Sequence, residues 1–222
     1  MGMGVKVRVW GPYALFSRPE MKVERCSYDV MTPSAARGIL EAIYWHPGLR
    51  WVIDKIQVNK PIRFTSVRRN EVKSKISASN VLQAYNGADK ELYLSTKEEI
   101  VQRASLLLCD VEYVIEAHFE MTENAAPSDN PGKFCDMLRR RVEKGKCYHQ
   151  PCLGTREFPA KVVKCVEMPP CPPELAGERD LGWMLLDLDY SDKENIKPVF
   201  FRAKLIDGVL TVPRMDSAEV TR

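Results

Sequence analysis

The sequence predicts an α+β fold for this chain of 222 residues. Alternating apolar and polar residues indicate strands, most clearly at 5–9 and 106–119. Two apolar faces with helical spacing each follow a proline-containing helix start, near Pro33 and at Pro131. Strands and helices alternate along the chain, so one mixed structure is expected rather than separate all-α and all-β parts.

The first helix begins at an N-cap. Thr32 offers a capping hydroxyl, and Pro33 supplies the fixed backbone that suits the first helical position. Pro47 and Gly48 are expected to end the helix, which places Tyr44 and His46 at its C-terminal end. Its expected apolar face consists of Ala35, Ala36, Ile39, Leu40 and Ile43.

Strands are expected on both sides of this helix. Residues 5–9 form the first, which Gly11 and Pro12 should stop, and residues 51–64 form the second. Between 65 and 104 the pattern weakens, and two short strands in a hairpin, turning near Asn86 and Gly87, are the expected organisation. The strand at 106–119, a second helix and a strand at 160–166 follow.

The second helix concentrates positive charge. It should start at Pro131, after an Asn130 N-cap, and end at Gly145. Its first turn combines free backbone N–H groups with the Lys133 ammonium, which favours a phosphate. A solvated helix face with Asp136–Arg140 and Glu143–Arg139 pairs is an equal alternative. The whole protein has a formal charge of +3, and the basic residues of this segment are Lys133, Arg139, Arg140, Arg141, Lys144 and Lys146.

The element order is strand, helix, strand, insertion, strand, helix, strand. This is the ferredoxin-like double split βαβ pattern, which is also the topology of RNA-recognition domains. The aromatic octamer of those domains is absent, so base stacking on the sheet is not assumed. A proline-rich linker at 168–174 follows, and then three strands, the last two joined at Asp207–Gly208. We therefore expect a ferredoxin-like domain at 1–167 with a hairpin insertion, and a small antiparallel β-sheet domain at 168–222.

This topology brings the end of the first helix to the start of the second. Tyr44 and His46 are thereby expected near Lys133, around an anion site without a carboxylate cage for Mg²⁺. The set suits metal-free RNA cleavage, in which the ribose 2′-OH attacks the adjacent phosphate and a cation stabilises the transition state. Tyr44 would orient that hydroxyl. The structural alternative is that Tyr44 and Trp45 are a packing pair at the helix end.

Composition narrows the kinds of site and the cellular compartment that the sequence allows. The chain has seven cysteines, an odd number without a CxxC pair, which indicates free thiols in a reduced compartment. Cys147, His149 and Cys152 are close in sequence but lack the second pair of a zinc site. No metal and no cofactor is expected. No apolar run is long enough for a membrane span, and the start lacks a signal peptide, so we expect a cytoplasmic protein with no membrane partner.

Several stretches together resemble the CRISPR-associated Cas-five family in its d-type (subtype I-C, or Dvulg) branch, over nearly the whole chain. The strongest are NPGKFCDMLRRR and CYHQPCLGTREFPA; the others are GPYALFSRPE, SYDVMTPSAARGILEAIYWHP, VRRNEVKSKI and LLLCDVEYVIEAHFEM. The resemblance implies an endoribonuclease that cuts CRISPR precursor RNA at the base of the repeat hairpin without metal. It also implies that the protein remains on the crRNA with the other subunits of the type I-C Cascade.

The family's catalytic set is a Tyr at the end of the first helix and a Lys-His pair in an NPGKH motif. Tyr44 and Lys133 match, but Phe134 stands where the family has histidine. His46 or His149 could replace it, and the topology favours His46. The alternative is a weakly active or inactive subunit that holds the crRNA 5′ handle.

The expected RNA-binding residues lie in two segments. The 65–104 insertion is locally basic and is interpreted either as an RNA-contacting arm or as an ordinary surface insertion. The residues assigned to RNA binding are Arg68, Arg69, Lys73, Arg139, Arg140, Arg141, Lys144 and Lys146. The sequence leaves open whether double-stranded DNA is also bound.

Overall fold

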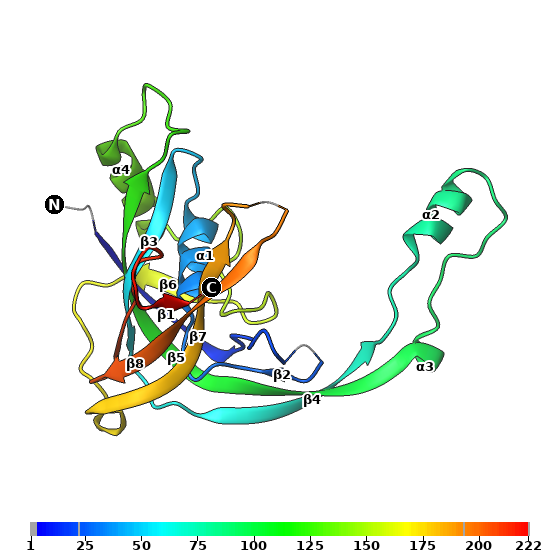
Figure 1. Ribbon diagram of the computed structural model, residues 1–222, viewed down its shortest axis with the longest axis horizontal. Coiled ribbons are helices and arrows are strands. Elements are labelled where there is room, and N and C mark those ends of the chain that lie inside the picture. Colours follow the sequence, from blue (N-terminus) through cyan, green and yellow to red (C-terminus); the bar gives the residue numbers. More distant parts are fainter. Residues whose placement is uncertain (1–3, 22, 193, 222) are drawn as a thin grey trace.

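The structure is a computed structural model that describes residues 4–21, 23–192 and 194–221. It combines helices with a large, mostly antiparallel sheet, which confirms the predicted α+β class (Figure 1). The strands are β1 (Val5–Ala14), β2 (Arg25–Cys26), β3 (Leu49–Val58), β4 (Phe64–Val72), β5 (Ile100–Met121), β6 (Lys161–Lys164), β7 (Glu178–Asp189), β8 (Lys197–Ile206), β9 (Val209–Thr211) and β10 (Val220–Thr221). The helices are α1 (Pro33–Ile43), α2 (Ala78–Tyr85), α3 (Thr96–Glu99), α4 (Pro131–Glu143) and the 3₁₀ turn η1 (Pro173–Leu175).

The centre of the sheet has the strand order β3-β5-β1-β6, and each neighbouring pair is antiparallel. Strand β1 runs to Ala14, past the predicted stop at Gly11, because β5 stays paired with it as far as Leu108. Strands β8 and β9 turn at Asp207 and Gly208, as predicted, and β9 pairs with β3. The C-terminal strands are therefore hydrogen-bonded into the same sheet as the N-terminal ones.

Alternation along the strands gives the sheet one apolar face, which α1 and α4 cover. Val7 and Val9 of β1 and Ile115 of β5 are buried together with Ile39 and Leu40 of α1. The opposite face carries ion pairs, including Lys6–Glu116 and Arg8–Glu112. The linker crosses this face, where the Gln57 side chain donates to the Pro169 carbonyl at 2.7 Å. This charged, partly covered face is not an open platform for stacked bases.

Both helix starts are as predicted. The Thr32 hydroxyl accepts the Ala35 N–H at 3.3 Å, and the Asn130 side chain accepts the Lys133 N–H at 2.9 Å. The end of α1 was predicted wrongly, because the helix stops at Ile43 rather than continuing to Pro47. Tyr44 turns into an extended conformation, which buries its ring against α4 instead of extending the helix.

The insertion forms a long hairpin that projects from the body of the molecule (Figure 1). Strands β4 and β5 pair from Phe64–Leu108 out to Val72–Ile100, which confirms the predicted hairpin. Its tip is helical rather than a tight turn, and Asn86 and Gly87 end α2 instead of joining two strands. Within the described residues α2 buries no side chain, so the arm tip adds nothing to the buried core.

The segment 147–160 clamps the ends of α1 and β1. Tyr148 and His149 donate their backbone N–H groups to the Ala42 carbonyl at 2.7 and 3.1 Å, and Leu15 donates to the Leu153 carbonyl at 3.0 Å. Gly154 has a φ of +89° and presses against the Leu15 carbonyl so closely that a Cβ would collide with it. The stretch CYHQPCLGTREFPA, which is this segment, thus holds the ends of α1 and β1 in place.

No helix in the described ranges is long and apolar enough to cross a lipid bilayer.

Candidate active site

Tyr44 lies at the C-terminal end of α1 with its side chain buried. Its ring centroid is 6.2 Å from that of Phe134, in the first turn of α4, and the Arg141 guanidinium lies 5.5 Å from the ring. Burial raises the pKa of the Tyr44 phenol, and the nearby Lys133 and Arg141 charges oppose that shift. Tyr44 therefore keeps its proton at neutral pH and is suited to donating a hydrogen bond.

Lys133 lies in the first turn of α4, close enough to Tyr44 for its charge to act on the phenol. The ammonium donates to Asp129 Oδ1 at 2.8 Å. The Lys133 side chain is 47% exposed, whereas that of Asp129 is 2% exposed. The carboxylate thus holds the ammonium from the protein side, and the other side of the ammonium stays open to a ligand.

Asp129 is a component of the site that sequence reasoning missed. Besides binding Lys133, its Oδ2 accepts the Ala126 N–H at 2.9 Å. The hydrogen bond from Lys133 is the main cause that lowers the pKa of the Asp129 carboxyl. The four-residue spacing of Asp129 and Lys133 was a signal, but Asp129 precedes the helix, where the pairing rule for helices gives no prediction.

Asp129→Asn is expected to reduce stability in a pH-dependent way. A carboxyl with a depressed pKa contributes its stability above the unfolded-state pKa of about 3.9 and loses it as pH falls through the folded-state value. The gap in urea unfolding between wild type and variant should therefore be constant from pH 5 to pH 8 and shrink below about pH 4. Asp136→Asn is the control, since the Asp136–Arg139 pair is mostly exposed. A gap that is unchanged at pH 3 would contradict the assignment.

His46 lies beside Phe134, with the two ring centroids 5.0 Å apart. Its Nδ1 accepts the Gly48 N–H at 3.0 Å, so the neutral imidazole carries its proton on Nε2. Asp129 Oδ2 lies 3.8 Å from the same Nδ1, beyond hydrogen-bond distance but close enough to attract a protonated ring. Ring contacts thus bring Tyr44 and His46 to Phe134, and Asp129 lies between His46 and Lys133.

Phe134 occupies the centre of this cluster and is itself 1% exposed. It contacts Tyr44 and His46 as well as Phe119 of β5, so its ring joins both helix ends to the sheet. His149, the other candidate to replace a histidine at 134, is exposed and lies edge-on to Tyr148, with centroids 4.4 Å apart. No ring contact with Phe134 brings it into the cluster.

Besides Lys133, Arg141 of α4 is directed at the site. Its guanidinium donates to the Ile43 carbonyl at 3.1 Å and lies over the Tyr44 ring. Arg139 pairs with Asp136 at 3.0 Å, so the suggested Asp136–Arg140 and Glu143–Arg139 pairs are replaced by one i,i+3 pair. Besides Lys133, the basic residues of this segment whose side chains remain exposed are Arg139, Arg140, Lys144 and Lys146.

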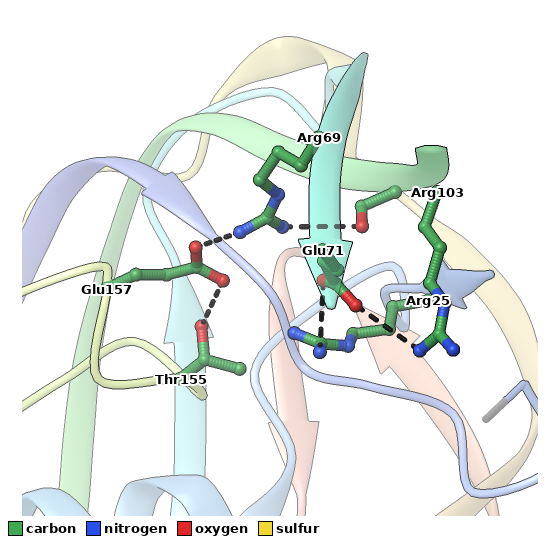
Figure 2. A network of polar contacts seen from close by, with 7 residues as sticks. Arg25, Arg69, Glu71, Arg103, Thr155 and Glu157 are labelled. Atoms are coloured by element: carbon green, nitrogen blue, oxygen red, sulfur yellow. Dashed lines mark hydrogen bonds and ion pairs between the residues drawn. The ribbon is translucent and has the colours of Figure 1, made fainter. Parts of the chain in front are cut away.

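The arginines of the arm face in different directions. Arg69 points toward the body, where it pairs with Glu157 and donates to the Ser105 hydroxyl at 3.3 Å (Figure 2). Beside it, Glu71 accepts from Arg25 and Arg103, both at 3.3 Å. This network attaches the base of the arm to the body. Arg68 is exposed, and Lys73 lies 3.9 Å from Glu99.

The sequence cluster of Cys147, His149 and Cys152 does not come together in space. Across the described residues, no three His, Cys, Asp or Glu side chains are grouped as metal ligands would be. Cys147 and His149 are exposed, while the backbone of Cys152 forms an isolated antiparallel β-bridge with that of Pro159.

Comparisons with a family model and with two named relatives agree on one protein family. The family model Cas_Cas5d, described as CRISPR-associated protein (Cas_Cas5), matches residues 4–213. A protein of Mannheimia succiniciproducens named CRISPR pre-crRNA endoribonuclease Cas5d is 50% identical, and the alignment covers 100% of both chains. A protein of the same name from Thermus thermophilus is 37% identical, with 98% of this chain and 95% of that protein covered.

Two solved structures share the fold at 24% identity. One is a CRISPR-associated protein with a TM-score of 0.71, which covers 100% of this chain and 97% of its own. The other is the functionally uncharacterized protein SMU1763c of Streptococcus mutans, with a TM-score of 0.69 and coverage of 100% and 98%. With the family model matching almost the full length, the chain belongs to the Cas5d family of CRISPR-associated proteins.

Proposed function

We propose that this protein is a metal-independent endoribonuclease that cuts CRISPR precursor RNA at the base of the repeat hairpin. The observation that carries the proposal is the approach of two helix ends about ninety residues apart in sequence, which packs Tyr44 against Phe134, the chain neighbour of the half-exposed Lys133. Relatives at 50% and 37% identity bear the name of this activity.

The residues divide the reaction between them. The buried Tyr44 phenol, which keeps its proton, orients the ribose 2′-OH toward the phosphorus, and the proton that the attacking hydroxyl loses passes to solvent water. The Lys133 ammonium, held by Asp129, stabilises the negative charge that grows on the phosphate oxygens in the transition state. Because Asp129 fixes the ammonium before RNA binds, less reorganisation is needed when the charge develops.

The leaving 5′ oxygen needs a proton, which histidine would supply in the family pattern. His46 is the proposed donor in this chain, acting as the imidazolium. In that form Nδ1–H faces Asp129 Oδ2, 3.8 Å away, in place of the Gly48 N–H, and the ring becomes neutral again when Nε2 gives its proton to the leaving oxygen. Its ring contacts Phe134, the residue at the family's histidine position, so the donor would act from a neighbouring element. His149 lies outside the cluster of ring contacts and is the less supported donor.

The cleavage assay uses the purified protein, repeat RNA from its own CRISPR array and EDTA. We expect cleavage at one position in the presence of the chelator. Repeat RNA with a 2′-deoxyribose on the 5′ side of the cut should stay intact, since the nucleophile is missing. Cleavage that requires added Mg²⁺, or that proceeds on the deoxy substrate, would overturn the proposed chemistry.

Several finer points belong to the same proposal. The strand order β3-β5-β1-β6 with α1 and α4 on one face supports a ferredoxin-like fold for 1–167; we propose 168–222 as a small C-terminal domain that continues the same sheet through β9. The proposed RNA contacts are the exposed basic residues of the arm and of α4. We further propose that the protein acts in the cytoplasm and stays on the crRNA with the other type I-C Cascade subunits; binding of double-stranded DNA is an additional property to test.

A second candidate function follows from Phe134. Phenylalanine cannot transfer a proton, and loss of general acid–base help typically costs about 10²- to 10⁴-fold in rate. In this second candidate function, the same surface holds the crRNA 5′ handle and the site does not cleave RNA. It predicts tight, salt-sensitive RNA binding without product in the assay above. Efficient cutting by the wild-type protein would exclude it.

A further inference from the structure

Trp45 is an exposed indole between two residues of the candidate site. The sequence allowed Tyr44 and Trp45 to be a packing pair, but the structure separates them: Tyr44 is buried and Trp45 is 58% exposed. Among the described residues, the Trp45 side chain takes part in no hydrogen bond or ring contact. Its aromatic face and its indole N–H are therefore both available to a ligand.

The turn that carries Trp45 is held in place on both sides. The Tyr44 carbonyl accepts the indole N–H of Trp51 at 3.0 Å, and the His46 carbonyl accepts the Leu49 N–H at 3.1 Å. The Pro47 carbonyl accepts the Thr122 hydroxyl at 2.6 Å. With these bonds the backbone around Trp45 is fixed, so the exposed ring is presented in a defined position rather than on a loose loop.

The surroundings of Trp45 indicate what the ring would bind. Its chain neighbours are Tyr44 and His46, and Lys133 and Arg141 supply positive charge to the same helix ends. A planar, uncharged group attached to a phosphate fits an aromatic face beside cations. An exposed aromatic residue on its own is common on protein surfaces. Here the place of Trp45 in the chain, between Tyr44 and His46, together with the fixed turn, sets it apart.

We propose that Trp45 is a base-stacking platform that holds an unpaired nucleobase next to the scissile phosphate. The inference rests on the proposed function and names a binding contact within it. Nucleotides at the base of a hairpin leave the duplex there, and proteins recognise such unpaired bases by stacking them on aromatic side chains. Stacking depends on the π-face rather than on hydrogen-bonding edges, so it tolerates different bases. Trp45 thus positions the strand, and the cations beside it receive the phosphate.

The first experiment measures binding rather than cleavage. The probe is the repeat RNA with a 2′-deoxyribose on the 5′ side of the cut, or unmodified repeat RNA if the wild type leaves it intact. Trp45→Ala should raise Kd about tenfold, and Trp45→Phe about threefold or less, in line with the loss per stacked base. Trp183→Ala is the matched control, because Trp183 on β7 is 54% exposed and lies in the C-terminal strands. Its Kd should equal that of the wild type.

The second experiment finds the base without relying on a variant that must fold. Abasic sites are placed singly at the nucleotides flanking the cut, and binding to wild-type protein is measured. One abasic position should weaken binding about tenfold, and Trp45→Ala should add nothing further at that position. Equal losses for Trp45→Ala on all abasic probes, or no effect of Trp45→Ala at all, would overturn the stacking contact. Absence of wild-type cleavage would instead refute the proposed function, while these binding results would still decide the role of Trp45.

Discussion

Lys133→Ala is expected to lower the rate of repeat-RNA cleavage by about 10²- to 10³-fold, the usual cost of removing one group that stabilises a transition-state charge. The ammonium is the half-exposed cation next to the Tyr44 phenol, and Asp129 holds it in place. Because the charge on the phosphate grows during the reaction, the loss should appear mainly in kcat rather than in KM. Single-turnover cleavage at saturating protein measures it.

Two controls separate this effect from a general loss of structure or charge. Lys204→Ala removes a half-exposed lysine that pairs with Glu178 on the C-terminal strands, outside the residues assigned to RNA binding, and should change cleavage little. Lys133→Ala leaves the Asp129 carboxylate without its ion pair, so the double variant Lys133→Ala/Asp129→Asn removes both charges. Cleavage should stay lost in the double variant even where its stability recovers. Near-normal cleavage by Lys133→Ala would remove Lys133 from the catalytic set.

Phe134→Ala is expected to destabilise the protein by about 3–5 kcal/mol, the range found for removing a buried phenylalanine ring. The ring is 1% exposed and packs against side chains of α1, β5 and the turn after α1. For a chain of this size each kcal/mol lowers Tm by about 2–4 °C, so a drop of roughly 6–20 °C should be seen by calorimetry. Activity should fall as well, since Phe134 separates and positions Tyr44 and His46.

Phe64→Ala is the matched control for size. Phe64 lies at the start of the arm with its ring 40% exposed, so its removal should cost much less stability. If Phe134→Ala were as stable as the control, the ring would not join the two helix ends. The site would then be held together by Asp129 and Arg141 rather than by aromatic packing.

Sequence reasoning succeeded where the signal was local. Thr32 and Asn130 cap their helices through their own side chains, and both interactions depend on residues within three positions. Apolar alternation predicted β1 and β5, because burial on one face of a strand imposes a period of two. The Asp207–Gly208 hairpin followed from the positive φ values that such a turn requires. The approach of the end of α1 to the start of α4 followed from the order of elements.

Sequence reasoning did not predict features that depend on contacts between residues far apart in the chain. The end of α1 was placed too late, because the burial of Tyr44 against Phe134 competes with continued helix formation. The helical arm tip was missed, since α2 has no buried face to impose a period on its sequence. The Arg69–Glu157 ion pair was not predicted, because Glu157 lies 88 residues away along the chain.

The sequence by itself determined the fold class, the two helix starts and the approach of the end of α1 to the start of α4, because each follows from local capping, periodicity or element order. Only the tertiary structure decided how the site is built around them. Burial of the Asp129 carboxylate beneath Lys133, the Gly48 N–H on His46 and the exposure of Trp45 all depend on contacts between segments. Such contacts leave no periodic trace in a single sequence, since they are set by which surfaces meet after the strands have paired.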